Sequence, residues 1–376
     1  MKLEQKILDA SNSWRTRFTN LQGAAPQLVF VFGGRRLLED PKIVGELIRS
    51  YGGANLVIAS TAGQISGTEV SEDCVVATAM ALEKTRIRTV ATEIAGAAES
   101  FSVGRELAGR LAGPDLAHVF VVSDGSLVNG TELARGFNEC LPSGVSVTGG
   151  LAGDGVRFEK TVVGLDEPPR VGRVVAVGFY GRQLCVGFGC AGGWAPFGPE
   201  RVVTRSHGNT LSELDGQSAL ALYKTYLGEC AADLPSSALR FPLCITPAGG
   251  GPQVVRTILS VDDAAGTMVF AGDMPLGARA RFMRASYEDL IDGAAHAADH
   301  AQIAAGAELA ICISCVGRRI VLGQRTEEET EVVQATLTGT PLLAGFYSYG
   351  ELAPSGGGSA CQLHNQTMTI TTLREE

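Results

Sequence analysis

The chain has 376 residues, of which 45% are hydrophobic, and its 31 basic against 40 acidic side chains give a formal net charge of −9. This length exceeds the usual limit for one hydrophobic core, so we expect two domains. No run of lysine or arginine could neutralise a nucleic-acid backbone. No stretch reaches the roughly 18 apolar residues of a membrane-spanning helix, and the first residues lack the apolar block of a signal peptide. We therefore expect a cytoplasmic protein with no nucleic-acid or membrane partner.

The N-terminal half alternates strand and helix patterns. We expect residues 1–25 to form a helical extension, followed by a strand at 28–32, a helix at 41–50 and a strand at 55–59. The same order returns further along the chain, with helices at 102–112 and 131–140 and strands at 118–122 and 144–148. This alternation predicts a layered α/β arrangement.

Residues 161–190 change to β-rich alternation. Two apolar runs at 174–180 and 184–190 flank Gly181, which is typical of a hairpin. Residues 192–209 are rich in Gly, Pro and aromatic side chains, so we expect them to connect two domains. The expected modules are therefore residues 26–208 and 209–376.

The sequence pattern of the second module predicts both helices and strands. Helix patterns cover 211–227, 286–305 and 327–337, and strand patterns cover 253–259, 267–271, 278–282, 309–316, 342–346 and 366–373. The whole chain therefore predicts a mixed α/β (α+β) fold, in which two modules of mixed sheets are flanked by helices.

Six ordered segments carry a family resemblance. They are IASTAGQIS (58–66), GGLAGDG (149–155), GGWAPFGPERVVTRSHGN (192–209), ELDGQSALALY (213–223), SCVGRR (314–319) and the tail from Gly345 to Thr371. These segments resemble the FIST family, which comprises sensory proteins of intracellular signal transduction with an N-terminal and a C-terminal module. Part of that family resembles haem-binding nitric oxide sensors, so the resemblance implies a sensor and raises haem as a cofactor.

The histidine of TRSHGNT is the first haem candidate. The resemblance implies His207 as an axial iron ligand, because a neutral imidazole suits that task, and Trp194 and Phe197 would line the porphyrin face. His364 is a second cofactor candidate. An exposed loop histidine explains His207 equally well, so both readings stay open.

The C-terminal tail has the composition of a ligand pocket. It brings Tyr347, Tyr349, Glu351, His364 and Asn365 into one short segment, although hydrogen bonds that tie the last strand to a turn would need the same residue types. Two further ligand candidates, Thr61 and Asp154, follow predicted strands, and the carboxyl ends of strands are where α/β proteins bind ligands.

Two other motifs favour structural interpretations. His296 and His300 lie four residues apart with Asp292 on one helix face, where a metal could bind, but a solvated face is the simpler explanation. Cys312 and Cys315 would point to opposite faces of a strand and could not meet as a dithiol. The nine cysteines are scattered singly and predict reduced thiols.

No nucleophile-elbow or zinc-protease motif occurs, which favours a receiver over an enzyme. The leading hypothesis is a haem-dependent nitric oxide sensor that acts on a sensor histidine kinase or a cyclic-dinucleotide signalling enzyme. The alternative is a haem-free receptor for a small metabolite such as an amino acid. An enzyme using Glu351, Cys361 or Asp154 is a third possibility, and a homodimer is compatible with the pattern.

Overall fold

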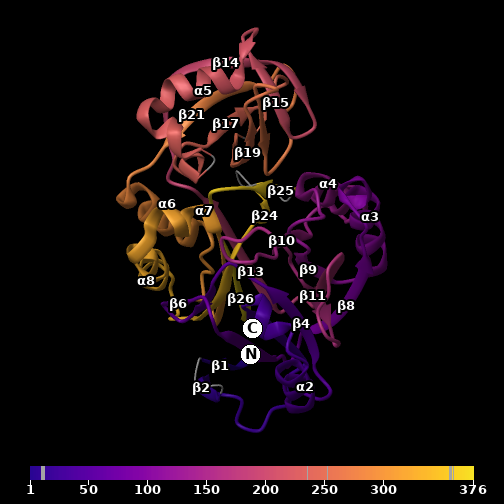
Figure 1. Ribbon diagram of the computed structural model, residues 1–376. Helices are drawn as coiled ribbons and strands as arrows, with labels where there is room; N and C mark the ends of the chain where they lie inside the picture. The colour runs from indigo at the N-terminus through magenta and orange to yellow at the C-terminus, as the bar shows by residue number, and fades with distance from the viewer. Residues whose placement is uncertain (10–12, 235, 252, 355–357, 359) are drawn as a thin grey trace.

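The structure is a computed structural model that describes residues 1–9, 13–234, 236–251, 253–354, 358 and 360–376. Its described strands form three six-stranded sheets and one eight-stranded sheet. The three six-stranded sheets make up a large lobe, and residues 195–284 make up a small lobe that lies above it in Figure 1. Both chain termini lie at the end of the large lobe that faces away from the small lobe (Figure 1).

The first sheet contains the N-terminal strands. Its spatial order is β11 (Val163–Leu165), β4 (Asn55–Ser60), β3 (Leu28–Gly33), β7 (Val75–Ala81), β1 (Lys2–Leu8) and β2 (Trp14–Thr19). The predicted helical extension over 1–25 is wrong, because Leu3, Gln5 and Ile7 alternate with more exposed neighbours and pair as β1 with β7. The helices α1 (Arg35–Leu38) and α2 (Pro41–Ser50) follow β3, and the Asp40 side chain caps α2.

The second sheet has the order β25 (Cys361–His364), β24 (Gly350–Pro354), β10 (Ser146–Leu151), β9 (Leu116–Ser123), β12 (Arg173–Tyr180) and β8 (Arg86–Glu93). The short η1 (Ala97–Glu99) leads into α3 (Ser100–Leu111), which covers the sheet together with α4 (Gly130–Cys140). The predicted strands and helices at 118–122, 102–112 and 131–140 are confirmed here.

The third sheet has the order β13 (Leu184–Ala191), β26 (Met368–Glu375), β22 (Leu309–Cys315), β23 (Leu342–Ser348), β5 (Gln64–Ser66) and β6 (Glu69–Ser71). It is accompanied by α6 (Tyr287–His300), α7 (Val316–Leu322), η4 (Gly323–Arg325) and α8 (Thr326–Thr336). The predicted hairpin at Gly181 is wrong, because β12 pairs with β8 and β9 whereas β13 pairs with β26 in a different sheet.

The three sheets repeat one arrangement. Each contains a parallel pair, which is β3 with β4, β9 with β10, or β22 with β23. The strand that follows each pair in the chain crosses to a neighbouring sheet: β5 joins β23, β11 joins β4, and β24 joins β10. The large lobe therefore has approximate threefold symmetry with exchanged strands.

Two glycines occupy equivalent positions in this arrangement. Gly149 in β10 has φ +149° and Gly345 in β23 has φ +153°, and a Cβ at either position would overlap the carbonyl of its partner, Val121 or Cys312. Only glycine fits such close backbone approaches without strain.

The inner faces of the three sheets share one core. Aromatic rings from different sheets meet there: Phe30 lies 4.9 Å from Phe120 and Phe32 lies 4.6 Å from Phe346, measured between ring centroids. The helices bury the outer faces, so each strand of a parallel pair is covered on both sides. This explains why apolar runs without alternation predicted these strands correctly.

The small lobe has its own core around Leu220, Tyr223 and Phe282. Its strand order is β18 (Val254–Arg256), β17 (Leu243–Thr246), β21 (Arg279–Arg284), β14 (Ala195–His207), β15 (Thr210–Leu214), β20 (Thr267–Phe270) and β19 (Ile258–Asp262), with β16 (Gln217–Ser218) beside β15. The helices are α5 (Ala219–Leu227), η2 (Gly228–Asp233) and η3 (Ser236–Arg240).

Two predictions for this lobe need correction. Residues 192–209 are not a linker, because most of them form β14, a central strand of the sheet. The helix expected from 211 begins only at Ala219, since Ser218 caps it and the preceding residues pair as β15 and β16.

The mixed fold with sheets flanked by helices is confirmed. Within the described residues, no helix is both long enough and apolar enough to cross a membrane.

Candidate functional site

The three strand crossovers meet at the end of the large lobe that faces the small lobe. Each crossover gives a backbone N–H to the carbonyl at the end of a parallel strand in a neighbouring sheet, so the three hydrogen bonds close a cycle, which we call the strand-end ring. The bonds are Gly153 N to Ser60 O (2.9 Å), Ala62 N to Tyr347 O (2.8 Å) and Tyr349 N to Leu151 O (3.2 Å).

The ligand candidates predicted from the sequence gather around this ring. Thr61, Asp154, Tyr347, Tyr349 and Glu351 all belong to it or lie within two residues of it in the chain. Their side chains nevertheless enter different surroundings, so proximity in the fold does not give them one role.

Thr61 is enclosed by its own loop. Its hydroxyl lies 2.7 Å from the side-chain amide of Gln64, which is itself buried and contacts Cys74. This network is complete, which favours a structural role for Thr61.

Asp154 belongs to an ion cluster. Its Oδ1 accepts hydrogen bonds from Arg157 Nε (3.0 Å) and Nη2 (2.7 Å), and Arg35 Nε lies 3.0 Å away. Burial opposes ionisation, but the hydrogen bonds from Arg157 and Arg35 outweigh it and lower the pKa of Asp154. Asp154 is therefore an ionised partner of two arginines.

Tyr347 lies in a buried network with Arg318. Its hydroxyl donates to Glu329, and Glu329 Oε2 accepts from Arg318 Nε (3.0 Å) and Nη2 (2.8 Å). Arg318 also donates to the carbonyls of Gly192 and Leu290, both at 2.6 Å. All three charged or phenolic side chains are inaccessible to solvent, so this network holds α7, α8 and the connection to the small lobe together.

Tyr349 closes the loop that follows Asp154. Its ring stacks on Phe158 at 4.5 Å, and its hydroxyl donates to Gly155 O and accepts from Phe158 N. Burial raises the pKa of Tyr349 to about 12. Tyr347 and Tyr349 therefore have partners within the protein.

Glu351 is different, because it makes no ion pair with any described residue. Its Oε1 accepts from Ser348 Oγ (2.6 Å), and its Oε2 accepts from Thr367 Oγ1 (2.9 Å) and Thr367 N (3.2 Å). The side chain is fully buried, and burial raises its pKa to about 8. A carboxyl group in this state can give up or retain a proton near neutral pH.

His364 lies beside Glu351 on the neighbouring strand, where β24 pairs with β25. Its Nε2 lies 3.0 Å from Ala353 O, so this nitrogen carries the hydrogen because a carbonyl can only accept. Burial lowers the pKa of His364 to about 4, with Arg256 adding to the effect. His364 is therefore a neutral imidazole at physiological pH.

Asn365 is buried without partners. It is 1% exposed, and neither its Oδ1 nor its Nδ2 makes a hydrogen bond within the described part of the chain. Leaving such a group unsatisfied costs on the order of 1–3 kcal/mol. Asn365 is therefore the strongest sign of a missing ligand or ordered water in this region.

Gln366 and Arg256 join this region to the small lobe. Gln366 Nε2 donates to Leu239 O (3.2 Å), and Arg256 Nη1 donates to Leu363 O (3.0 Å). Gln366 has φ +62°, which turns the chain sharply after Asn365. We call the group of Ser348, Glu351, His364, Asn365 and Thr367 the interlobe site; in Figure 1, β24 and β25 lie directly below the small lobe.

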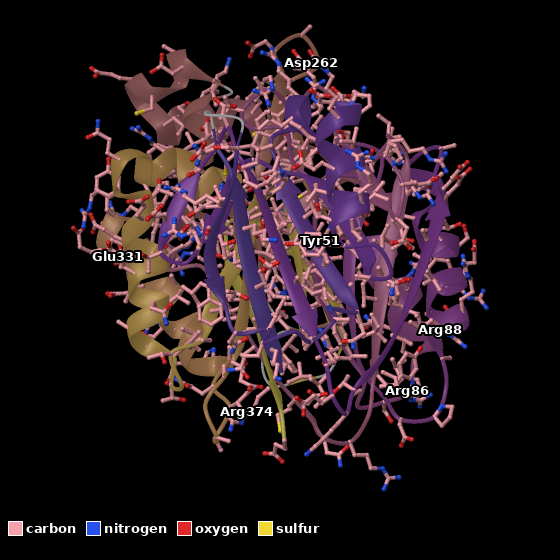
Figure 2. The ribbon with its side chains drawn as sticks, turned by 90° about the horizontal axis from the view of Figure 1, so that it is seen from below. Tyr51, Arg86, Arg88, Asp262, Glu331 and Arg374 are labelled. Carbon is pink, nitrogen blue, oxygen red and sulfur yellow. The ribbon has the colours of Figure 1, made fainter. Side chains whose placement is uncertain are left out.

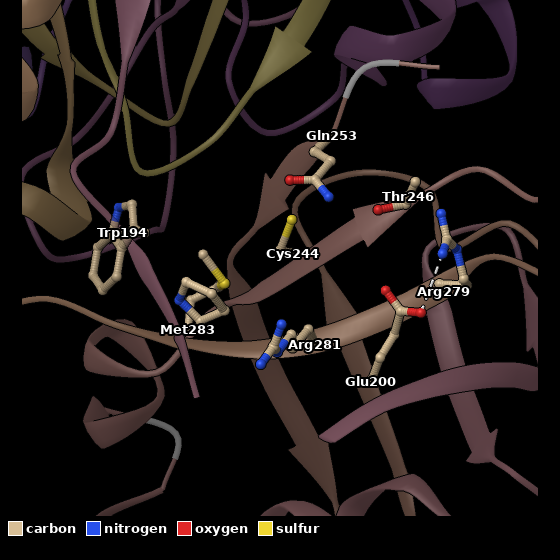
Figure 3. A pocket seen from close by; sticks show the side chains of 9 residues that line it. Trp194, Glu200, Cys244, Thr246, Gln253, Arg279, Arg281 and Met283 are labelled. Atoms are coloured by element: carbon tan, nitrogen blue, oxygen red, sulfur yellow. Dashed lines mark hydrogen bonds and ion pairs between the residues drawn. The ribbon is translucent and has the colours of Figure 1, made fainter. Parts of the chain in front are cut away.

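A cavity of about 160 Å³ opens on the small-lobe side. Figure 3 shows Arg279 and Glu200, which pair at 3.3 Å, together with Arg281 and Trp194. The indole N–H of Trp194 donates to Gln366 O (2.7 Å), so this side chain lines the cavity and also contacts the segment that carries Asn365.

The residues predicted to hold haem do not share one site. His207 is exposed at the end of β14, whereas Phe197 packs near Phe282 in the small lobe. These two residues are ten positions apart along β14, whose pairing is irregular at several points. Trp194 immediately precedes this strand, and its indole N–H donates to Gln366 O. The haem expectation stays a prediction that this geometry does not favour.

The other metal and thiol motifs have structural roles. Asp292, His296 and His300 lie exposed on α6, as a solvated face requires, and the described residues contain no group of three metal-binding side chains. Cys312 and Cys315 lie on β22, as predicted, and both are buried.

Sequence reasoning missed three important polar residues. Thr367 and Ser348 hold Glu351, and Arg318 supports the entire region. The only sequence signal for Arg318 was the SCVGRR segment, because its partner Glu329 lies in an ordinary acidic first turn of a helix.

Two family models match consecutive parts of the chain. Residues 27–217 match the FIST N domain and residues 219–354 match the FIST C domain. A crystal structure of chorismatase at 1.08 Å resolution aligns with 99% of this chain and 98% of its own, at 10% identity and a TM-score of 0.34. That likeness is too distant to carry an argument. A search of curated proteins gave no match.

Proposed function

The chain belongs to the FIST family of sensory signal-transduction domains, and from this premise we propose that it is a receptor for a small polar metabolite bound at the interlobe site. The observation that carries the proposal is the buried, unpaired amide of Asn365. A ligand that accepts from Nδ2 and donates to Oδ1 would remove the energetic cost of that unpaired amide.

The chemistry of the site suits an amino acid. An ammonium group would find the carboxyl group of Glu351, and its positive charge would favour the ionised form of that carboxyl. Binding would then release a proton near neutral pH, because the unliganded pKa is about 8. The neutral imidazole of His364 adds an acceptor without a competing positive charge.

The cavity lined by Trp194, whose indole bonds to Gln366 beside the interlobe site, suits a small ligand. Its volume of about 160 Å³ lies below the roughly 300–1,000 Å³ of pockets that hold drug-sized molecules. A porphyrin would require a much larger opening between the lobes. We therefore favour the metabolite receptor over the haem-dependent nitric oxide sensor, for which the family resemblance is the main support.

The signal would pass through the contacts between the lobes. A ligand at Asn365 lies next to Gln366, which holds Leu239 of the small lobe and the indole of Trp194. Ligand binding could bias the position of the small lobe only if the affinity differs between two arrangements. The proposed output remains a separate partner, either a sensor histidine kinase or a cyclic-dinucleotide signalling enzyme.

A thermal-shift screen tests the proposal. The native protein is screened against single amino acids and small organic acids, and a specific ligand raises its melting temperature. Asn365→Ala should lose this rise. The control is Asn20→Ala, whose side chain accepts from Leu3 N far from the site and should lower stability without removing the ligand response. A ligand response that survives Asn365→Ala contradicts the proposal.

The haem alternative has its own readout. Protein expressed with haem supplied is examined for a Soret band, together with His207→Ala and His364→Ala. A band that disappears in one variant would establish haem and identify its ligand, and would overturn the preference for a metabolite.

A further inference from the structure

A second groove lies at the opposite end of the large lobe, between the first and second sheets. Its volume is about 700 Å³, within the range of small-molecule pockets. The edge strand β8 runs along it, Asn55 of the first sheet lies on one side, and the turn at 112–114 after α3 lies on the other. We call it the basal groove.

Two arginines of β8 give the groove its positive charge. Arg86 and Arg88 are two residues apart on one face of the strand, so their Cα atoms are separated by about 7 Å. Neither guanidinium pairs with a carboxylate among the residues described. Figure 2, which views the molecule from below, shows both side chains at the same edge.

Both arginines are positioned by neighbours that leave their charge available. Arg86 lies over the Tyr180 ring at 5.9 Å, directly across the strand pair, and Arg88 Nη1 donates to Arg110 O at 2.9 Å. Opposite Arg88 stands Gly178, whose missing side chain leaves room for the Tyr180 ring. These contacts orient the guanidinium groups without neutralising them.

The groove also borders an acidic side chain. Thr85 is 8% exposed, and its hydroxyl and backbone N–H both lie at the carboxylate of Glu375. That carboxylate also accepts from the backbone N–H groups of Glu83 and Lys84. Its negative charge is therefore partly compensated before any ligand arrives.

We propose that the basal groove binds a small anion of the phosphate or carboxylate class, bridged by Arg86 and Arg88. The planar guanidinium group of arginine suits such oxyanions, because two of its N–H donors can bond to two oxygens of one carboxylate or phosphate. This site is independent of the interlobe site, which lies at the other end of the large lobe, so the two can be tested separately.

Calorimetric titration at constant ionic strength tests the proposal with inorganic pyrophosphate and with citrate as probes. We expect saturable one-to-one binding of at least one probe and a loss of affinity of about tenfold or more in Arg86→Gln/Arg88→Gln, since each lost bond is charge-assisted. Pyrophosphate alone would identify the phosphate class, and citrate alone the carboxylate class.

The matched control is Arg205→Gln/Arg240→Gln, which removes two positive charges from exposed positions of the small lobe. This variant should bind both probes like the native protein. Unchanged melting of the unliganded groove variant verifies its fold. The proposal is overturned if the native protein and the groove variant bind the probes with equal affinity, or if both double variants lose affinity equally. It is also overturned if neither probe binds at millimolar concentration.

Discussion

Glu351 and His364 lie directly opposite each other on the antiparallel strands β24 and β25, and burial drives both toward their uncharged forms. The pKa of Glu351 is raised to about 8 and that of His364 is lowered to about 4. Between these values, a carboxylic acid and a neutral imidazole are the stable pair. The interlobe site therefore presents donors and acceptors with little net charge at neutral pH.

The raised pKa of Glu351 predicts a specific pH dependence of stability. Between its ordinary value of 4.5 and about 8, the folded protein retains a proton that the unfolded chain has lost, so the free energy of unfolding falls as pH rises through this window. Glu351→Gln cannot ionise and should lose less stability between pH 5 and pH 8. Urea unfolding of both proteins at the two pH values measures the difference; parallel losses would contradict the raised pKa.

The buried histidine on β9 acts in the opposite direction. His118 lies between Ser146 Oγ (2.7 Å) and Thr148 Oγ1 (3.0 Å), and burial lowers its pKa to about 3. The unfolded chain takes up this proton near pH 6.5, so stability should fall as pH drops from there toward 3. His118→Asn should make this acid limb shallower in circular-dichroism titrations, and His364, whose pKa is also lowered, accounts for part of what remains. His207→Asn, at the exposed end of β14, serves as the control.

The Arg318–Glu329 pair should be costly to break. Both side chains are fully buried, and Glu329→Gln would leave the guanidinium without its counter-charge. We expect a loss of about 3–5 kcal/mol in the free energy of unfolding. The comparison is Glu213→Gln, which breaks the exposed pair with Arg205 and should cost at most about 1 kcal/mol. Similar losses in the two variants would show that the buried network is not the anchor described here.

Asn365 predicts an unusual gain. Because neither amide atom is bonded to a residue that the structure describes, Asn365→Leu should leave the unliganded protein as stable as before or raise its free energy of unfolding by about 1–3 kcal/mol. If the amide of Asn365 were hydrogen-bonded within the protein, the same substitution would lower the free energy of unfolding instead. Chemical unfolding without added metabolites measures this, and a clear destabilisation would indicate an unseen structural partner.

The sequence predicted individual elements better than their partners. The strands at 28–32, 55–59 and 309–316 were recognisable because sheets covered on both faces need continuous apolar runs. The false hairpin at Gly181 shows the limit, since β12 and β13 satisfy local hairpin rules while pairing in different sheets. The exchanged strands of the three sheets depend on contacts between distant segments, which local patterns do not record.

The same limit applies to the site. The tail composition predicted Glu351, His364 and Asn365 as ligand or cofactor contacts, which stays a prediction, and it also nominated Tyr347 and Tyr349, which bond within the protein. What distinguishes Asn365 from the other tail residues is that its side-chain amide has no hydrogen-bond partner among the described residues. That property depends on residues far away in the chain, such as the Glu329 that accepts from Tyr347, and cannot be read from the motif alone.

The most direct test of the central claim is a calorimetric titration of the best-binding amino acid from the screen into the native protein and into Asn365→Ala at neutral pH. The account predicts one-to-one binding to the native protein, with a heat that changes with buffer because Glu351 releases a proton, and no detectable binding to the variant. Binding of equal affinity to both proteins would contradict the placement of the ligand at the interlobe site.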